Sequence, residues 1–221
     1  MSPKSLKIDK LPTIRRLPNY LQILRFLAAS GEEFVSSAYL AEQMGIEAIL
    51  VRKDLELTGV SGTPRVGFSI PDLIRSIEDF LGWRGTVDAC LVGAGQLGAA
   101  LLAHRDLPGY GVRIVAAFDT DESKIGTAVH GVSIFSATRL PDLLMRLNIR
   151  LAIVCVPAES AQQVTDLLVQ SGIQAIWIFT SAAINVPPNI IFQKEDLLSG
   201  LAVLSAQLTR SGPNTGSKGG G

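Results

Sequence analysis

The hydrophobic and polar positions follow one rhythm up to about residue 81 and another from residue 86 onward. In the first part, apolar residues recur at the spacing of amphipathic helices. Four helices are predicted there, over about 17–28, 36–44, 47–57 and 71–81. The stretch 59–68 is rich in glycine and proline, which predicts turns or a short hairpin.

The second part consists of short apolar runs that alternate with helical patterns. The runs are rich in branched residues and cover 86–92, 112–118, 151–156 and 175–179. Such runs are typical of strands that are covered on both faces. Helical patterns lie between them, at 96–105, 138–147 and 158–171. The alternation predicts an α/β domain with a parallel sheet and right-handed crossovers.

A final helix is predicted over about 196–209. Its leucines form a heptad-like seam of Leu197, Leu201, Leu204 and Leu208. Two interpretations stay open for this seam: it packs on the chain's own sheet, or it forms a dimer contact. The residues that follow, 211–221, are predicted to be a flexible tail.

Composition and charge exclude several classes of protein. Of the 221 residues, 47% are apolar and 18% are charged, which is typical of a globular protein. The net charge is zero, so the whole chain has no electrostatic bias toward nucleic acid, although residues 1–30 carry six basic groups and one acid. No apolar run reaches the ~20 residues of a membrane span, and the N-terminus lacks a secretory signal, which predicts a cytoplasmic protein. Cys90 and Cys155 are interpreted as core residues of buried strands rather than a redox pair.

A glycine triplet follows the strand predicted over 86–92. Gly93 is expected to make a tight turn, Gly95 to let a pyrophosphate approach the backbone, and Gly98 to let the next helix pack closely. The free N–H groups at the start of that helix then face the phosphates.

An acidic residue stands where a dinucleotide-binding domain requires one. Asp119 ends the next predicted strand and can accept hydrogen bonds from both ribose hydroxyls of an adenosine. Its charge opposes a 2′-phosphate, which favours NAD(H) over NADP(H). The simpler alternative for Asp119 is a cap or turn residue. The strand ends at Val156–Pro157 and Thr180 are expected to border the same crevice.

The chain offers few candidate catalytic residues that could act on a bound nucleotide. Its two histidines, His104 and His130, do not stand with a second acid in a catalytic pattern. We see no metal-ligand spacing and no nucleophile motif, so no metal and no catalytic residue is predicted. This points to a sensor rather than an enzyme.

The segment 36–57 has the proportions of a helix-turn-helix. Gly45 breaks it, and the second helix carries Arg52 and Lys53, which can meet phosphates or guanine edges. Arg15 and Arg16 can add phosphate contacts. The stretch 59–68 would then be a wing, with Arg65 in it.

Several segments together give the chain a specific resemblance. They are 12–20, 51–55, 93–98, 117–121, 124–126, 130–132, 156–158 and 195–201. On these motifs, nearly all of 10–209 resembles the redox-sensing transcriptional repressors of the Rex family. The resemblance implies a homodimer that binds double-stranded operator DNA when NADH is scarce and releases it when NADH binds.

The same resemblance implies domains and site residues. The implied domains are a winged helix over 1–84, a Rossmann NAD(H)-binding domain over 85–195, a domain-swapped dimerisation helix over 196–210, and the tail over 211–221. The implied cofactor contacts are Gly93, Ala94, Gly95, Gln96, Leu97, Gly98, Asp119, Thr120, Lys124, Val156, Pro157, Thr180 and Asp196. The implied DNA contacts are Arg15, Arg16, Ser36, Arg52, Lys53 and Arg65.

The chain departs from the family pattern at four places. The wing ends in Gly67-Phe68 where the family usually has Gly-Tyr, and Leu50 replaces a polar residue before the Val-Arg-Lys motif. His104 stands where some members have a tyrosine, and Leu197 where an aromatic residue is usual. Two alternatives therefore stay open: an enzyme or enzyme subunit whose Rossmann domain binds a nucleotide or coenzyme A, and an NADH-sensing paralogue that has lost DNA binding.

Overall fold

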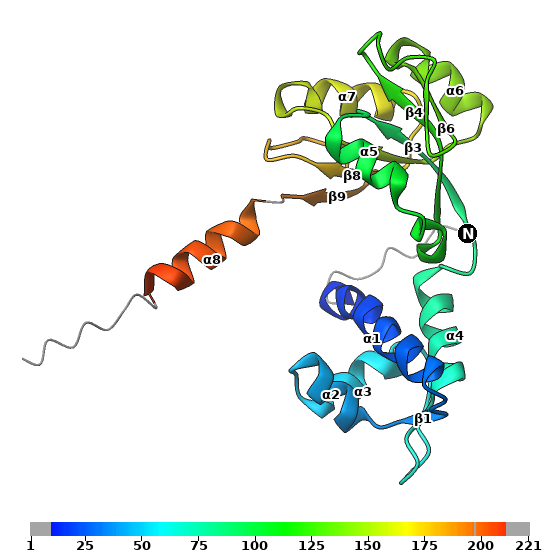
Figure 1. Ribbon diagram of the computed structural model, residues 1–221, viewed down its shortest axis with the longest axis vertical. Helices are drawn as coiled ribbons and strands as arrows, with labels where there is room; N and C mark the ends of the chain where they lie inside the picture. Colours follow the sequence, from blue (N-terminus) through cyan, green and yellow to red (C-terminus); the bar gives the residue numbers. More distant parts are fainter. Residues whose placement is uncertain (1–9, 197, 211–221) are drawn as a thin grey trace, which may run out of the picture. The chain divides into compact units, whose positions relative to one another are not determined.

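The computed structural model describes residues 10–196 and 198–210, drawn in colour in Figure 1. The chain divides into two compact units, one up to Gly85 and one from Thr86. Residues 1–9 of the basic segment 1–30, Leu197 of the predicted leucine seam and the predicted tail over 211–221 lie outside the described residues.

The first unit is a small helical domain with a two-stranded sheet. Its elements are α1 (Leu11–Ala29), β1 (Phe34–Val35), α2 (Ser37–Met44), α3 (Ala48–Glu56), β2 (Phe68–Ser69) and α4 (Ile70–Leu81). The four predicted helices are confirmed, but α1 begins six residues earlier than the apolar pattern, at Leu11, and contains Pro18. A proline near the start of α1, Pro12, suits a first helical turn, where its missing N–H costs nothing.

One apolar core holds this unit together. Its fully buried side chains recur along α1, α3 and α4 at helical spacing, and the largest is Tyr20. The α2–α3 connection is a left-handed turn at Gly45 (φ 63°), which places α2 and α3 as a helix-turn-helix. Ser36 caps α2 by accepting a hydrogen bond from the Tyr39 N–H.

The predicted hairpin over 59–68 is a wing. Thr63 and Gly67 exchange backbone hydrogen bonds of 2.7 and 2.9 Å, and Arg65 at the tip adopts a left-handed conformation (φ 66°). A Cβ on Gly67 would collide with the Val35 carbonyl group, so this position requires glycine. β2 then pairs antiparallel with β1, a pairing between distant segments that the sequence pattern did not predict.

The second unit is a mixed sheet flanked by helices. Its strands are β3 (Val87–Val92), β4 (Val112–Asp119), β5 (Ala128–Val129), β6 (Val132–Ser136), β7 (Leu151–Val154), β8 (Ala175–Phe179) and β9 (Ile191–Glu195). Its α-helices are α5 (Gln96–Ala103), α6 (Leu140–Arg146), α7 (Ala158–Gln170) and α8 (Ser199–Arg210), with short 3₁₀ turns at Leu107–Tyr110 and Ala137–Arg139.

The strand order is β5-β6-β4-β3-β7-β8-β9, and all neighbours are parallel except β5 and β6. The four predicted strands form the centre of this sheet, which confirms the Rossmann-type topology. The pattern gave no strand bounds for β5, β6 and β9, and it extended β7 two residues too far. The chain leaves β7 after Val154 because Pro157 follows the loop at Cys155 and Val156.

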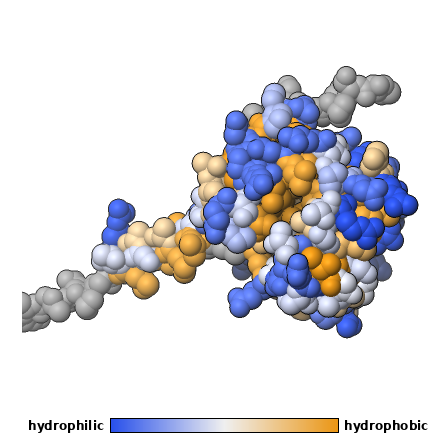
Figure 2. All heavy atoms as spheres, turned by 90° about the horizontal axis from the view of Figure 1, so that it is seen from above, coloured by the Kyte–Doolittle hydropathy of each residue, from blue (hydrophilic) through white to orange (hydrophobic). Residues whose placement is uncertain are grey.

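The last helix starts later than predicted, and its exposed side chains exclude the first of the two interpretations left open for its leucine seam. α8 begins at Ser199, not near Asp196, because the Asp196 carboxylate accepts a hydrogen bond from the Leu198 N–H and opens a turn there. None of its side chains is buried, so the helix does not pack on its own sheet. Figure 2 shows apolar residues along it. The exposed ones are Leu201, Val203, Leu204 and Leu208, with Leu198 just before the helix.

Candidate nucleotide site and nucleic-acid interface

A cavity of about 310 Å³ lies at the carboxyl edge of the sheet, where β3 ends between β4 and β7. In an open α/β sheet this reversal of strand order marks the expected ligand crevice. The cavity brings together seven of the predicted cofactor residues: Gly93, Gly95, Asp119, Thr120, Lys124, Val156 and Pro157.

The glycine loop has the geometry that the sequence predicts. Gly93 adopts a left-handed conformation (φ 94°), and a Cβ there would lie 2.6 Å from the Cys155 carbonyl oxygen. A Cβ on Gly98 would collide with the Gly93 carbonyl, so α5 can approach the loop only with glycine at this position. Open space surrounds Gly95, where nothing lies within 4 Å of an added Cβ. The loop therefore leaves room for a phosphate beside its backbone.

Asp119 ties the end of β4 to the glycine loop. Its Oδ2 accepts hydrogen bonds from the Ala94 N–H at 2.8 Å and from Lys124 Nζ at 3.3 Å, and its Oδ1 accepts one from the Asp121 N–H at 2.9 Å. Partial burial opposes ionisation, but these hydrogen bonds outweigh it and lower the pKa of Asp119. The carboxylate is therefore ionised at neutral pH. The bond to Asp121 is the turn role that the sequence left as the alternative. The three bonds use three of the about four acceptor sites of the carboxylate, so one site remains for a ribose hydroxyl.

The other predicted cofactor residues lie outside the lining of this cavity. Ala94, Gln96, Leu97 and Gly98 form the loop and the first turn of α5. Thr180 is buried and accepts a hydrogen bond from the Ala182 N–H, while the Asp196 carboxylate is used in the turn before α8.

Sequence reasoning missed part of the lining. The additional residues are Val92, Phe118, Ala137, Cys155, Ser160 and Val164. Cys155 is half-buried in the loop after β7 rather than in a core strand, which corrects that prediction. Burial raises the pKa of its thiol to about 12, so it stays protonated. Its position near the end of a predicted strand, next to Val156, could have identified Cys155 as a lining residue.

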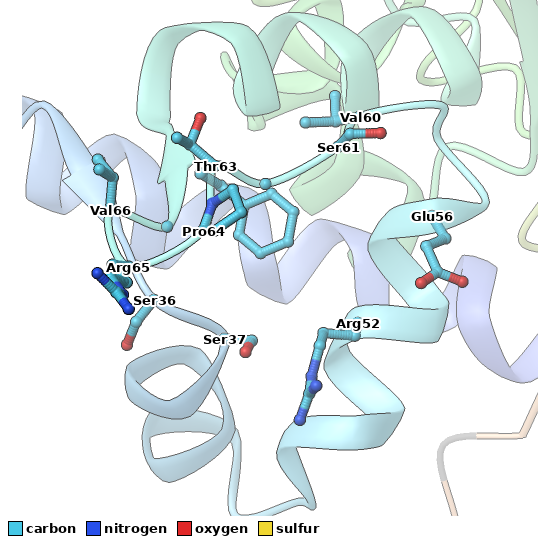
Figure 3. A pocket seen from close by; sticks show the side chains of 13 residues that line it. Ser36, Ser37, Arg52, Glu56, Val60, Ser61, Thr63, Pro64, Arg65 and Val66 are labelled. Carbon is cyan, nitrogen blue, oxygen red and sulfur yellow. The ribbon is translucent and has the colours of Figure 1, made fainter.

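The candidate DNA interface lies on the first unit. A cavity of about 530 Å³ opens between the wing, the start of α2 and α3, and three predicted DNA residues line it: Ser36, Arg52 and Arg65 (Figure 3). Lys53 is exposed on α3 beside it, and Arg15 is exposed on α1. Neither Arg15 nor Lys53 lines this cavity.

Arg16 has a different environment. Its Nε and Nη2 donate hydrogen bonds to the Asp54 carboxylate at 2.6 and 2.7 Å. Asp54 is buried and also accepts hydrogen bonds from Thr13 Oγ1 at 2.8 Å and Tyr20 Oη at 2.9 Å. The guanidinium of Arg16 therefore neutralises a buried charge of α3. Sequence reasoning missed Asp54, although it falls on the same helical face as the buried Val51 and Leu55.

A winged helix followed by a Rossmann domain with a glycine-rich loop defines a transcriptional regulator with a nucleotide-binding sensor domain. The chain is 40% identical to the redox-sensing transcriptional repressor Rex of Treponema denticola over 91% of its length and 96% of that protein. It is 40% identical to the protein of the same name from Bacteroides fragilis, over 89% of its length and 90% of that protein. The chain belongs to the Rex family of redox-sensing transcriptional repressors.

Solved structures and family matches agree with this assignment. The structure resembles a Rex-family repressor, RSP, in complex with β-NAD⁺ and operator DNA (TM-score 0.86, 30% identity, 91% of this chain and 93% of that chain). It also resembles RSP in complex with β-NADH (TM-score 0.83, 29% identity, 93% of this chain and 97% of that chain). Residues 11–56 match the family of a putative DNA-binding protein N-terminus, and residues 86–182 match the CoA binding domain.

These findings decide against the enzyme or enzyme-subunit alternative. The CoA binding match covers only the second unit, whereas the curated relatives span both units and are named repressors rather than enzymes. The protein is therefore a repressor, as the sequence predicts. Within the described residues, no helix has the length and apolarity to cross a bilayer. No group of three or more potential ligands among those residues is arranged to hold a metal ion.

Proposed function

We propose that this protein is an NADH-responsive repressor that binds operator DNA as a homodimer when NADH is scarce and releases it when NADH binds. It acts in the cytoplasm, where the DNA and the nucleotide pool meet. The observation that carries the proposal is the presence of both sites on one chain: the glycine-loop cavity with Asp119 and the wing cavity with Arg52 and Arg65.

The residues of the first cavity fit the adenosine and pyrophosphate part of NAD(H). The open space at Gly95 receives the pyrophosphate, and the N–H groups at the start of α5 face it. Asp119 lies within the same cavity and accepts the ribose hydroxyls. Val156 and Pro157 line the side toward β7, and Thr180 directly follows β8, so the nicotinamide extends along these strand ends.

The charge of the nicotinamide ring explains why the two redox forms should bind with different affinity. The reduced ring is neutral and tolerates an apolar crevice, whereas the oxidised ring carries a positive charge whose burial costs free energy. A ligand shifts an equilibrium only by its differential affinity for the two states. Driving operator occupancy from about 99% to about 1% requires a ~10⁴-fold preference of NADH for the released form, or about 100-fold at each of two sites.

The exposed leucines of α8 provide the dimer contact. Leu201, Leu204 and Leu208 are 57%, 56% and 73% exposed and follow helical spacing. A second copy of the chain covers them. The resulting dimer carries two winged helices, which together bind a two-fold symmetric operator.

Reciprocal titrations test the proposal. If NADH releases the operator, saturating operator must weaken NADH binding by the same factor, because the coupling free energy is shared. NADH is titrated into the full-length protein with and without operator DNA, and NAD⁺ at the same concentrations is the control. Equal NADH affinities in the two titrations would exclude the sensor mechanism.

A further inference from the structure

α3 presents one exposed stripe to solvent. Ile49, Arg52, Lys53 and Glu56 are all exposed, and their spacing of three, one and three residues places them on one helix face. The opposite face is buried through Val51, Asp54 and Leu55. The core therefore fixes which residues of α3 face solvent, and Glu56 is among them.

Glu56 also lines the wing cavity. Figure 3 shows Arg52 and Glu56 projecting from α3, with Ser37 and Arg65 across the cavity. The residues of the wing that line the cavity include no second acid. Glu56 is thus the single carboxylate in the described lining of this cavity.

No partner within the described residues neutralises this carboxylate. None of the ion pairs of that part of the chain includes Glu56, Arg52 or Arg65. Arg52 donates only a long contact of 3.4 Å from Nε to the Ala48 carbonyl oxygen. The two arginines are free to meet phosphates, and Glu56 faces the same DNA surface with its charge uncompensated.

A carboxylate on such a surface is repelled by the DNA backbone, so it gains only from donors on the base edges. In the major groove those donors are the exocyclic amino groups of cytosine (N4) and adenine (N6), and carboxylates characteristically accept from cytosine N4. We propose that Glu56 accepts a hydrogen bond from such an amino group and imposes a base requirement on each half of the operator. The inference rests on the proposed function, because it needs α3 in the major groove.

The test is the DNA sequence that the full-length protein selects from a random duplex library. The wild type is compared with Glu56→Ala and Glu56→Gln, and Glu42→Gln on α2 is the matched control because it removes the same charge from an exposed position of the same unit. NADH binding by each variant reports that the chain is folded.

We expect the wild type to enrich cytosine or adenine at one position of each half-site, and the enriched base identifies the amino group. Glu56→Ala should lower the discrimination at that position by about 5- to 150-fold and leave the rest of the motif unchanged. Glu56→Gln should shift the preference toward adenine, because an amide can pair with adenine N6 and N7 together. Glu42→Gln should select the wild-type motif.

Two results would overturn the inference. Identical motifs for all variants, with tighter binding to every sequence when Glu56 is replaced, would mean that Glu56 only repels phosphates. A changed motif for Glu42→Gln as well would mean that net charge and not base contact sets the preference. Failure of the wild type to select any sequence would instead contradict the proposed function, and the inference with it.

Discussion

The guanidinium of Arg16 on α1 and the carboxylate of Asp54 on α3 form a two-point ion pair, with Nε–Oδ2 and Nη2–Oδ1 distances of 2.6 and 2.7 Å. Asp54 directly follows Lys53 and lies half a turn from Arg52 on α3, the helix that is proposed to face the DNA. The pair therefore fixes how α3 is rotated against α1, and with it the direction of the exposed stripe.

Removing the Asp54 carboxylate should destabilise the first unit strongly. Asp54→Ala leaves Arg16, Thr13 and Tyr20 without their shared acceptor, and breaking a buried pair on one side costs about 3–5 kcal/mol. The loss should be measured as faster amide hydrogen exchange in peptides from 11–56. Glu78→Gln is the control, because it breaks the more exposed pair with Arg25, which is worth under about 1 kcal/mol. Equal increases in amide exchange for the two variants would contradict a stabilising role of the buried Arg16–Asp54 pair.

The same network predicts how stability depends on pH. Burial opposes the charge of Asp54, but hydrogen bonds from Arg16, Thr13 and Tyr20 lower its pKa, so its contribution is present above the unfolded value near pH 4 and is lost as pH falls below it. Burial and the bond to Asp54 raise the pKa of Tyr20, so the network also weakens above about pH 10, where an unfolded tyrosine ionises. Urea unfolding should show the advantage of the wild type over Asp54→Asn at pH 7 and its loss near pH 3. A difference in unfolding free energy that does not change with pH would argue against the titration of Asp54 as its cause.

Asp119 should determine the preference for NADH over NADPH. Its ionised carboxylate opposes a 2′-phosphate, although Lys124 at 3.3 Å offsets part of the charge. Asp119→Asn keeps an acceptor for the Ala94 N–H and removes the charge. It should narrow the affinity gap by about tenfold, which corresponds to 1.4 kcal/mol. Fluorescence titrations with both nucleotides measure the gap, and equal affinities in the unmutated protein would remove the ribose assignment.

Arg52 and Lys53 should contribute to operator binding without affecting the nucleotide site. Each of Arg52→Ala and Lys53→Ala should weaken operator binding and, for a phosphate contact, lower the salt slope by about one. NADH affinity should not change. Arg146→Ala, at an exposed position on α6 of the second unit, is the control. Unchanged gel shifts for both α3 variants would mean that this helix does not contact DNA.

The apolar face of α8 should control assembly. Burying one leucine contributes about 1.5–3 kcal/mol, so Leu204→Ser together with Leu208→Ser removes several kcal/mol from a two-fold contact. Light scattering should show a monomer at concentrations where the wild type is a dimer. Met145→Ser on α6 is the control, since Met145 is 75% exposed and lies away from this helix in sequence. A variant that stays dimeric would place the interface elsewhere.

The sequence predicted the features that are encoded locally. The strand–glycine–helix pattern at 86–105 specifies the nucleotide loop because Gly93 is required by its left-handed backbone and Gly98 by its close approach to the Gly93 carbonyl. β9 escaped prediction because Ile191–Glu195 mixes apolar and charged residues at the edge of the sheet, where one side needs no apolar cover. The β1–β2 pair could not be predicted because its partners are more than thirty residues apart, and a local hydrophobic pattern does not indicate which distant segments pair.

The charged residues were harder to interpret than the apolar ones. Arg15 and Arg16 are neighbours of the same type, yet Arg15 is exposed and Arg16 is bound to Asp54. Only the tertiary packing of α1 on α3 separates their roles. Asp119 shows the same limit, because a turn residue and a ribose ligand occupy the same place in the sequence and the structure supports the first role directly.

The bond between the Asp119 carboxylate and the Ala94 N–H makes the two ends of an adenosine diphosphate group energetically dependent on each other. A ribose that draws on Asp119 would loosen its hold on the loop that receives the phosphates, and by the reciprocity of coupling a loop ordered with this bond intact would weaken the bonds of Asp119 to the ribose. Adenosine and pyrophosphate are therefore not independent fragments at this site, and the free energy of binding the intact nucleotide is not the sum of the free energies of binding its pieces.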